Sequence, residues 1–201
     1  MQVQKTTIAD ALIIEPDVFG DQRGFFMELY QNERYASCGV KRSFVQDNLS
    51  RSARGVLRGL HFQTGKPQGK LVTVLHGAVL DVVVDVRIGS PTFGAHAAIE
   101  LNDENRRQIW APRGLAHGFL VLSESADFFY KCDNPYSPAD EVVLRWNDPA
   151  LAIQWGCQSP TLSPRDRSGR TLAELKDLLP YYQAEGCEYS LPDQPASSAA
   201  P

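Results

Sequence analysis

The segment from Gly55 to Lys70 holds the densest group of side chains able to do acid–base and anion chemistry. It reads GVLRGLHFQTGKPQGK and places Arg58, His61, Lys66 and Lys70 among glycines and a proline. An ordinary histidine titrates near pH 6.5, so His61 can accept a proton near neutral pH. A lone histidine is more often a core residue bonded to a backbone carbonyl. His61 has cationic neighbours, which favours a site.

The spacing of Arg58 and His61 sets a condition on that site. They are three residues apart, and strict alternation along a strand would direct them to opposite faces of the sheet. A β-bulge at Gly59 would turn both side chains to one face. The hypothesis that both serve one site therefore requires an irregular strand at Gly59.

Three further segments carry candidate groups, each with a plain structural interpretation of its own. His117 opens an apolar strand in WAPRGLAHGFLVL, a pattern typical of a hairpin with a surface histidine. Tyr130 and Tyr136 occur in FFYKCDNPYSPADE, and buried tyrosines are usually packing residues with one bonded hydroxyl. Asp166 lies in the charged segment LSPRDRSGR and is most simply a solvated turn residue.

Motifs for metals and cofactors are missing from the sequence. There is no HxH pair, GxxxxGK loop or GxGxxG turn, and His76 and His96 lack acidic residues at ligand spacing. We therefore predict no metal and no cofactor, which leaves acid–base chemistry by His, Tyr and Asp side chains. The four cysteines form no CxxC pair and are expected to be reduced, mostly structural thiols.

The elements that must position these groups are mainly strands. Seven runs rich in β-branched and aromatic residues follow one another between turn signals: KLVTVLHG, AVLDVVVDVR, AHAAIEL, RQIWAP, HGFLVL, ADFFYKC and EVVLRW. No helices separate them, as a parallel sheet would require. The pattern predicts an all-β fold, a jelly-roll (cupin-like) β-sandwich or barrel with a few short helices.

Two helices are indicated. A short one is expected at 31–37, ended by Gly39. A second, near the C-terminus, is predicted in TLAELKDLLP, where Thr171 can cap and Pro180 marks the end. Its apolar stripe is expected to pack on the outside of the sandwich and comprises Leu172, Leu175, Leu178 and Leu179.

Length and charge restrict the class of protein. The chain has 201 residues, 20 basic and 24 acidic, with a net charge of -4, so it lacks the positive field that nucleic acids require. It has neither an apolar stretch long enough for a membrane span nor a signal-peptide core, which predicts a cytoplasmic protein. We expect one domain at 1–183 and a flexible Ser/Ala/Pro-rich tail at 184–201.

Taken together, the motifs resemble the dTDP-4-dehydrorhamnose 3,5-epimerase family of cupin-like nucleotide-sugar epimerases in deoxysugar biosynthesis. The resemblance runs from about Val3 to Leu179 and includes GDQRGFFME, FVQDNLSRS, GVLRGLHFQ, WAPRGLAHGFLVLSE, FFYKCDNPYSP and RWNDP. It implies that His61 is the catalytic base and Tyr130 the acid on the opposite face of the sugar. Asp166 would orient and charge-stabilise His61, and Lys70 is our candidate for stabilising the enolate.

The resemblance also implies a set of residues that bind a dTDP-4-keto-6-deoxyhexose. Arginines would engage the diphosphate, polar residues would hold nucleotide and sugar hydroxyls, and aromatic side chains could stack on the thymine. These residues are Arg23, Phe26, Glu28, Gln46, Asn48, Arg58, His117, Tyr136, Glu141 and Arg165. Family members are homodimers, and the strand from Arg23 to Glu28 could reach into the partner's site.

The sequence leaves the reaction open in some respects. Asn134 and Pro135 precede Tyr136 where many 3,5-epimerases have a second aromatic residue, and Arg165 stands where lysine is commoner. Relatives that invert C3 alone also keep the histidine and tyrosine. A C3-only epimerase, a catalytically silent nucleotide-sugar-binding cupin and a 3,4-ketoisomerase of related fold are the alternatives.

Overall fold

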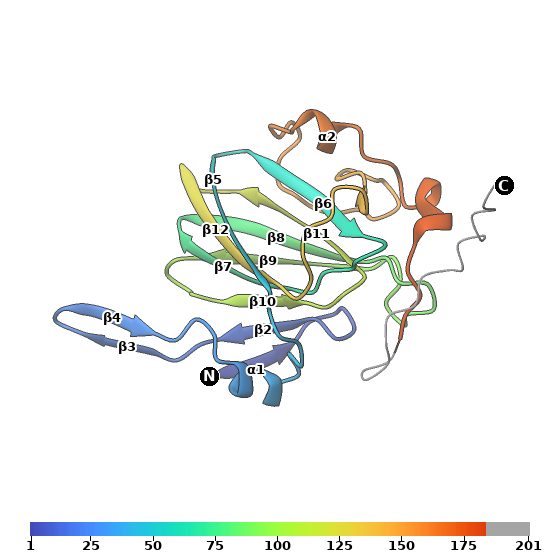
Figure 1. Cartoon of the computed structure of the whole chain (residues 1–201). Helices are drawn as coiled ribbons and strands as arrows, with labels where there is room; N and C mark the ends of the chain where they lie inside the picture. The colour runs from blue at the N-terminus through green and yellow to red at the C-terminus, as the bar shows by residue number, and fades with distance from the viewer. Residues whose placement is uncertain (184–201) are drawn as a thin grey trace.

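Two antiparallel β-sheets packed face to face make up the body of the computed structural model, which describes residues 1–183 (Figure 1). The predicted tail at 184–201, with Cys187, lies outside the described residues. The six-stranded sheet has the order β1-β2-β10-β7-β12-β5 and the five-stranded sheet the order β13-β6-β11-β8-β9. A two-stranded hairpin, β3 (Val18–Asp21) and β4 (Gly24–Met27), projects from the body (Figure 1).

The strands of the six-stranded sheet are β1 (Gln2–Lys5), β2 (Leu12–Glu15), β10 (Gln108–Ala111), β7 (Lys70–His76), β12 (Ser125–Cys132) and β5 (Gln46–Ala53). Those of the five-stranded sheet are β13 (Glu141–Val143), β6 (Leu57–Gln63), β11 (Leu115–Val121), β8 (Ala78–Asp85) and β9 (His96–Asn102). The predicted all-β sandwich is confirmed. Over the described residues the sheets do not close into a barrel, since β1 and β5 end one sheet and β13 and β9 the other.

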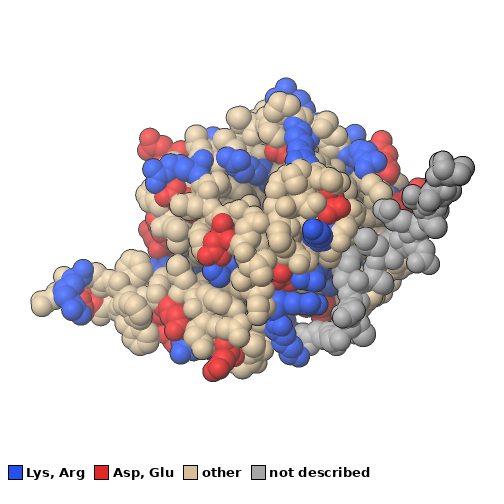
Figure 2. Space-filling model, in the orientation of Figure 1, with Lys and Arg blue, Asp and Glu red and all other residues tan. Residues whose placement is uncertain are grey.

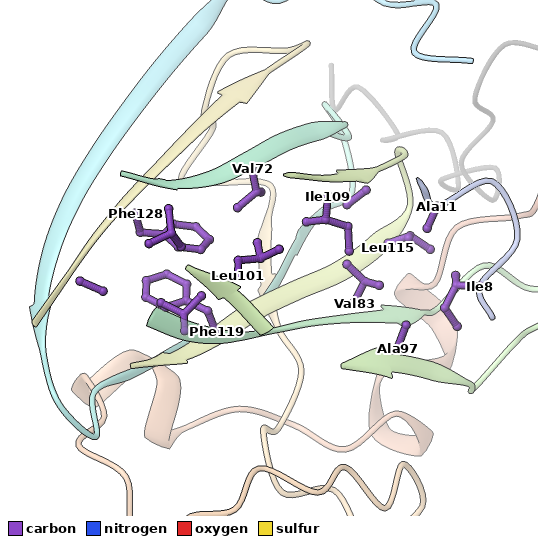
Figure 3. Close-up of a cluster of buried hydrophobic side chains, with 14 of the residues drawn as sticks. Ile8, Ala11, Val72, Val83, Ala97, Leu101, Ile109, Leu115, Phe119 and Phe128 are labelled. Atoms are coloured by element: carbon purple, nitrogen blue, oxygen red, sulfur yellow. The ribbon is translucent and has the colours of Figure 1, made fainter. Parts of the chain in front are cut away.

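The main core lies between the two sheets (Figure 3). Val72, Ile109 and Phe128 enter it from the six-stranded sheet, and Val83 and Phe119 from the five-stranded sheet. The rings of Phe119 and Phe128 stack with centroids 3.8 Å apart and planes at 14°, which joins the two sheets. Burying one such side chain contributes about 1.5–3 kcal/mol to the stability of the fold. This layer of side chains therefore sets the spacing between the two sheets.

The outer face of the five-stranded sheet is covered as well, which explains the long apolar run of β8. Val83 of β8 faces the inter-sheet core, whereas Val82 and Val84 pack in a second cluster with Trp155 and Leu175 from the C-terminal part of the chain. A strand buried on both faces needs apolar residues at successive positions and shows no clean alternation. A third cluster, with Tyr35 and Trp110, covers part of the six-stranded sheet.

The helices follow the sequence prediction in part. Helix α1 (Asn32–Ser37) is confirmed, with Gly39 in a left-handed conformation at φ 107° just after it. The C-terminal helix is present but is a 3₁₀ helix, η1 (Ala173–Leu178), and the predicted cap is wrong, since Leu172 and not Thr171 stands at its N-cap. Of the predicted stripe, Leu175 and Leu179 are buried, but Leu178 is 36% exposed. Tighter winding over six residues gives a narrower apolar face than an α-helix would.

Charged side chains are interspersed on the molecular surface. The face in Figure 2 shows basic and acidic groups side by side, with basic atoms at the far end of the β3–β4 hairpin. In the described part of the chain, no helix has the length and apolar character needed to cross a membrane. Cys38, Cys132 and Cys157 are free thiols.

Candidate active site

A cavity of about 370 Å³ opens between the two sheets, a size typical of small-molecule sites. Both sheets and helix α2 (Pro164–Arg167) contribute to its lining. The structure brings eleven of the predicted site residues to it: Gln46, Asn48, Arg58, His61, Lys70, His117, Tyr130, Tyr136, Glu141, Arg165 and Asp166. These come from seven separate elements and a loop, so the tertiary fold assembles the site.

An irregularity in β6 lets Arg58 and His61 share the cavity. The pairing of β6 with β11 shifts register, with His61 opposite His117 but Arg58 opposite Phe119. Three steps along β6 thus match two steps along β11, which is a bulge. Gly59 lies at its centre with φ 116°, and a Cβ there would be 2.6 Å from the Cα of Gly118. The expected bulge is confirmed, and glycine is required by both backbone conformation and close approach.

His61 and Asp166 form the central pair of the site. The Nε2 of His61 is 2.5 Å from the Oδ1 of Asp166, which is 4% exposed and therefore not a solvated turn residue. Ser163 N-caps α2 and places the carboxylate, with the Asp166 backbone N–H donating to its Oγ at 3.0 Å. Burial disfavours the charged form of Asp166, but hydrogen bonds from His61 and Ser163 outweigh it and lower the pKa of the carboxyl.

The ionised carboxylate determines which nitrogen of His61 is available. A carboxylate only accepts hydrogen bonds, so Nε2 carries the proton and Nδ1 keeps a free lone pair. Nδ1 lies 4.0 Å from the Oε1 of Glu141, another residue of the cavity wall. This arrangement presents an imidazole base with a carboxyl group beside each ring nitrogen.

Tyr130 and Lys70 reach the cavity from the opposite sheet. Tyr130 lies on β12 and Lys70 on β7, two neighbouring strands of the six-stranded sheet, whereas His61 lies on the five-stranded sheet. Burial raises the pKa of Tyr130 to about 12, so its hydroxyl keeps its proton. Burial also lowers the pKa of the Lys70 ammonium. A ligand between the sheets would meet a base on one wall and a proton donor on the other.

His117 is buried, and its partner was not anticipated from the sequence. Its Nε2 is 2.9 Å from the Oδ2 of Asp81, whose side chain is fully buried in β8. The signal for Asp81 was an aspartate interrupting the apolar run AVLDVVVD. The ring of His117 also stacks with Phe128, with centroids 6.0 Å apart. His117 is therefore a fixed part of the cavity wall and not a surface histidine.

Polar side chains link the rim of the cavity. Arg165 forms an ion pair with Glu141, and its Nη1 donates to the Tyr136 hydroxyl at 3.0 Å. The Tyr136 backbone N–H donates to the Oε1 of Gln46 at 2.8 Å. Further lining residues that sequence reasoning missed are Ser50, Gln68, Gly118, Phe119, Phe128 and Ser163.

Three predicted residues do not reach the cavity of their own chain. Arg23 is at the end of the β3–β4 hairpin, where its Nε donates to Asp21 at 3.0 Å. Phe26, on the same hairpin, is 69% exposed. Glu28 pairs instead with Arg34 of α1 at 2.8 Å. Within residues 1–183, no three His, Cys, Asp or Glu side chains are grouped so that they could hold a metal ion.

Comparisons with known proteins agree on one family. The family model described as dTDP-4-dehydrorhamnose 3,5-epimerase matches residues 5–174. A dTDP-4-dehydrorhamnose 3,5-epimerase of Pseudomonas aeruginosa is 52% identical over 176 residues, covering 87% of this chain and 97% of that protein. A dTDP-4-dehydrorhamnose 3-epimerase of Streptomyces niveus is 42% identical over 186 residues, covering 90% of each.

A solved structure matches the fold closely. It is a dTDP-6-deoxy-D-glucose-3,5-epimerase from Legionella pneumophila in complex with dTDP-4-keto-L-rhamnose. The two chains are 50% identical with a TM-score of 0.88, and the match covers 91% of this chain and 99% of that one. Sequence and fold therefore agree over almost the whole described region.

Proposed function

The chain belongs to the dTDP-4-dehydrorhamnose 3,5-epimerase family, and on that premise we propose that it inverts C3 and C5 of dTDP-4-keto-6-deoxy-D-glucose. The product is dTDP-4-keto-L-rhamnose, which makes the enzyme an isomerase of rhamnose biosynthesis. The Legionella relative was solved with this same compound, which supports the assignment. Residues 1–183 would form the catalytic domain, in keeping with the family match at 5–174.

The chemistry starts from the acidity of the sugar. The C4 keto group acidifies the C–H bonds at C3 and C5, because removing either proton places the negative charge on the C4 oxygen as an enolate. Inversion requires that the proton leave from one face and return to the other. The enzyme must therefore supply a base, an acid on the opposite side and a group that stabilises the enolate oxygen.

His61 is the base in this proposal. Asp166 holds the proton on Nε2, so the Nδ1 lone pair is the one left to take the proton from carbon. The imidazolium that forms is stabilised by the Asp166 carboxylate at 2.5 Å and by Glu141 at 4.0 Å. A base held in place by a buried carboxylate typically contributes about 10²–10⁴-fold to the rate.

Tyr130 is the acid, and Lys70 stabilises the enolate. With a pKa of about 12, the Tyr130 hydroxyl is protonated at neutral pH and can deliver its proton from the six-stranded sheet. The Lys70 ammonium comes from the neighbouring strand β7 and is partly buried in the cavity wall, where a positive charge acts more strongly on a developing oxyanion than it would in bulk water. By analogy with oxyanion-hole donors, this contact would lower the barrier by about 3–4 kcal/mol.

The remaining cavity residues bind the nucleotide sugar in this proposal. Arg58 and Arg165 would engage the diphosphate, since a guanidinium can donate two parallel hydrogen bonds to phosphate oxygens. Gln46, Asn48 and Glu141 would hold hydroxyl groups of the nucleotide and sugar. Tyr136 at the rim offers a flat surface for the thymine, and His117 completes the wall of the sugar pocket.

We further propose a homodimer in which the β3–β4 hairpin enters the partner's site. The hairpin projects from the body and exposes Phe19, Phe25 and Phe26, an apolar group that would favour contact with a second chain (Figure 1). Arg23 would add a positive charge near the diphosphate, and Phe26 would contact the base. Glu28 would complete this set from the base of the hairpin. A cytoplasmic location stays a prediction.

The observation that carries the proposed function is the pairing of His61 with Asp166 in a cavity whose opposite sheet supplies Tyr130 and Lys70. The test is incubation with dTDP-4-keto-6-deoxy-D-glucose in deuterated water, followed by NMR of the product. Deuterium at both C3 and C5 is expected.

Other labelling patterns identify the alternatives. Deuterium at C3 alone would establish the C3-only reaction. This reaction is the second candidate because one relative is a 3-epimerase. Binding without exchange would indicate a silent cupin. Transfer of the carbonyl to C3 would indicate a ketoisomerase.

A further inference from the structure

We propose that Ser163 is a positioning residue that sets the basicity of His61 through Asp166. The inference deepens the proposed function and rests on it. The Ser163 hydroxyl donates to the Oδ2 of Asp166 at 2.8 Å, while His61 Nε2 lies 2.5 Å from Oδ1 of the same carboxylate. The three side chains form a chain of hydrogen bonds that runs from the cavity to the N-terminus of α2.

Ser163 is held in place by a reciprocal bond. The Asp166 backbone N–H donates to the Ser163 Oγ at 3.0 Å, so the hydroxyl accepts from the backbone and donates to the side chain of the same residue. The hydroxyl proton therefore points at the carboxylate. Ser163 also lines the cavity, on the same side as Asp166.

The hydroxyl acts on the charge that His61 experiences. The Asp166 carboxylate accepts from two side-chain donors, His61 at Oδ1 and Ser163 at Oδ2. Each donor draws negative charge toward itself, so fewer donors leave more charge facing the imidazole. Loss of the Ser163 donor should therefore stabilise the protonated imidazole and make His61 release its proton at higher pH.

The other charged and titratable groups facing His61 stay in place in such a variant. They come from both sheets and from α2, and they are Arg58, Lys70, His117, Tyr130, Tyr136, Glu141 and Arg165. The nearest of them with a resolved contact to His61 is Glu141, 4.0 Å from Nδ1. A change confined to Ser163 therefore tests the hydrogen bond to Asp166 against a constant electrostatic background.

The chain contains a matched hydroxyl that has the same local geometry away from the site. Thr171 and Glu174 bond reciprocally at the start of η1, with the Thr171 Oγ1 donating to the Glu174 Oε2 at 2.8 Å and accepting from the Glu174 backbone N–H at 3.3 Å. The Glu174 carboxylate pairs with Arg145 and has no contact with the cavity residues. Thr171→Ala thus removes a hydroxyl with the same pair of reciprocal bonds without touching the base.

The experiment is the pH dependence of kcat/KM for the wild type, S163A, S163G, S163T and T171A. In S163A and S163G the acidic limb of the kcat/KM profile should move to higher pH by roughly half a unit. At a given pH on that limb, kcat/KM should therefore fall about threefold. S163G separates the hydroxyl from helix capping, because glycine at an N-cap costs only a few tenths of a kcal/mol relative to serine. S163T keeps a hydroxyl and should return the limb to the wild-type position, and T171A should not move it.

Thermal unfolding of each variant shows whether the fold is retained. An acidic limb that stays in place in both S163A and S163G would overturn the inference. A loss of stability alone would then indicate that Ser163 is only a helix cap, and a raised KM alone would indicate direct contact with the substrate. Failure of the proposed function is distinguishable, because the wild type itself would then not label both C3 and C5 in deuterated water.

Discussion

His61 and Asp166 are 105 residues apart in the chain, and their side chains meet at 2.5 Å in the wall of the cavity. One lies next to a bulge in β6 and the other on the four-residue helix α2, which packs beside β6. A contact over this sequence separation depends on the whole sandwich. The proposed base is thus completed by α2, a short helix near the C-terminal end of the described residues.

Asp166→Asn should lower kcat by roughly 10²-fold or more with little change in KM, because an amide cannot balance the charge of the imidazolium. Steady-state kinetics on the keto sugar measures this. The matched control is Asp103→Asn at the surface, where Asp103 lies 3.3 Å from the exposed His76. A wild-type kcat in the Asp166→Asn protein would remove Asp166 from the mechanism.

Tyr130→Phe should separate proton removal from inversion. His61 would still take the proton and return it to the same face, so recovered substrate should gain deuterium while product formation falls by roughly 10²–10⁴-fold. NMR of substrate and product in deuterated water gives both rates. Tyr30→Phe, on the surface of the six-stranded sheet, is the control. Product formed at the wild-type rate by Tyr130→Phe would exclude Tyr130 as the acid.

The basic limb of the kcat profile should report Lys70. Burial lowers the pKa of its ammonium from the ordinary 10.5, whereas the pKa of Tyr130 is raised to about 12. The stabilising charge is present below the lowered pKa and is lost as pH rises through it, so activity should fall before Tyr130 ionises. Lys70→Arg, with a guanidinium that stays charged, should move this limb upward. A limb at the same pH in Lys70→Arg would assign it to another group.

The proposed homodimer predicts complementation between two inactive proteins. In a mixed dimer of His61→Ala and Arg23→Ala chains, one site would combine an intact His61 with an intact Arg23 from the partner. After mixing through reversible unfolding, roughly a quarter of the sites should regain wild-type kinetics, given random pairing in a two-fold dimer. Light scattering measures the mass of the protein in solution and so shows whether it is a dimer. Mixtures no more active than the sum of their parts would show that Arg23 does not act across an interface.

Much of this could be predicted from the sequence, and the exceptions share a cause. The strands from β7 to β13 and helix α1 follow from local composition, and the bulge at Gly59 follows from requiring Arg58 and His61 to share a face. Local reasoning alone reads Asp166 as a turn residue, since its burial depends on β6, far away in the chain. The resemblance to the family corrected that interpretation.

Asp81 and Ser163 were missed for the same reason. Asp81 looked like an interruption in an apolar strand, because nothing nearby in sequence showed that His117 would pair with it from β11. Ser163 lies in the charged segment LSPRDRSGR, where nothing local singles it out, and its bond to Asp166 depends on which way the Asp166 side chain points. The hairpin residues Arg23 and Phe26 lie outside the cavity of their own chain, and their place in a site stays a proposal that depends on the proposed dimer.

The most direct test of the account compares the wild type and His61→Ala in deuterated water, with His76→Ala as the surface control. Wild type and His76→Ala should place deuterium at both C3 and C5 of the product, and His61→Ala should place it at neither. A His61→Ala protein that exchanges either proton at close to the wild-type rate would contradict the assignment of His61 as the base.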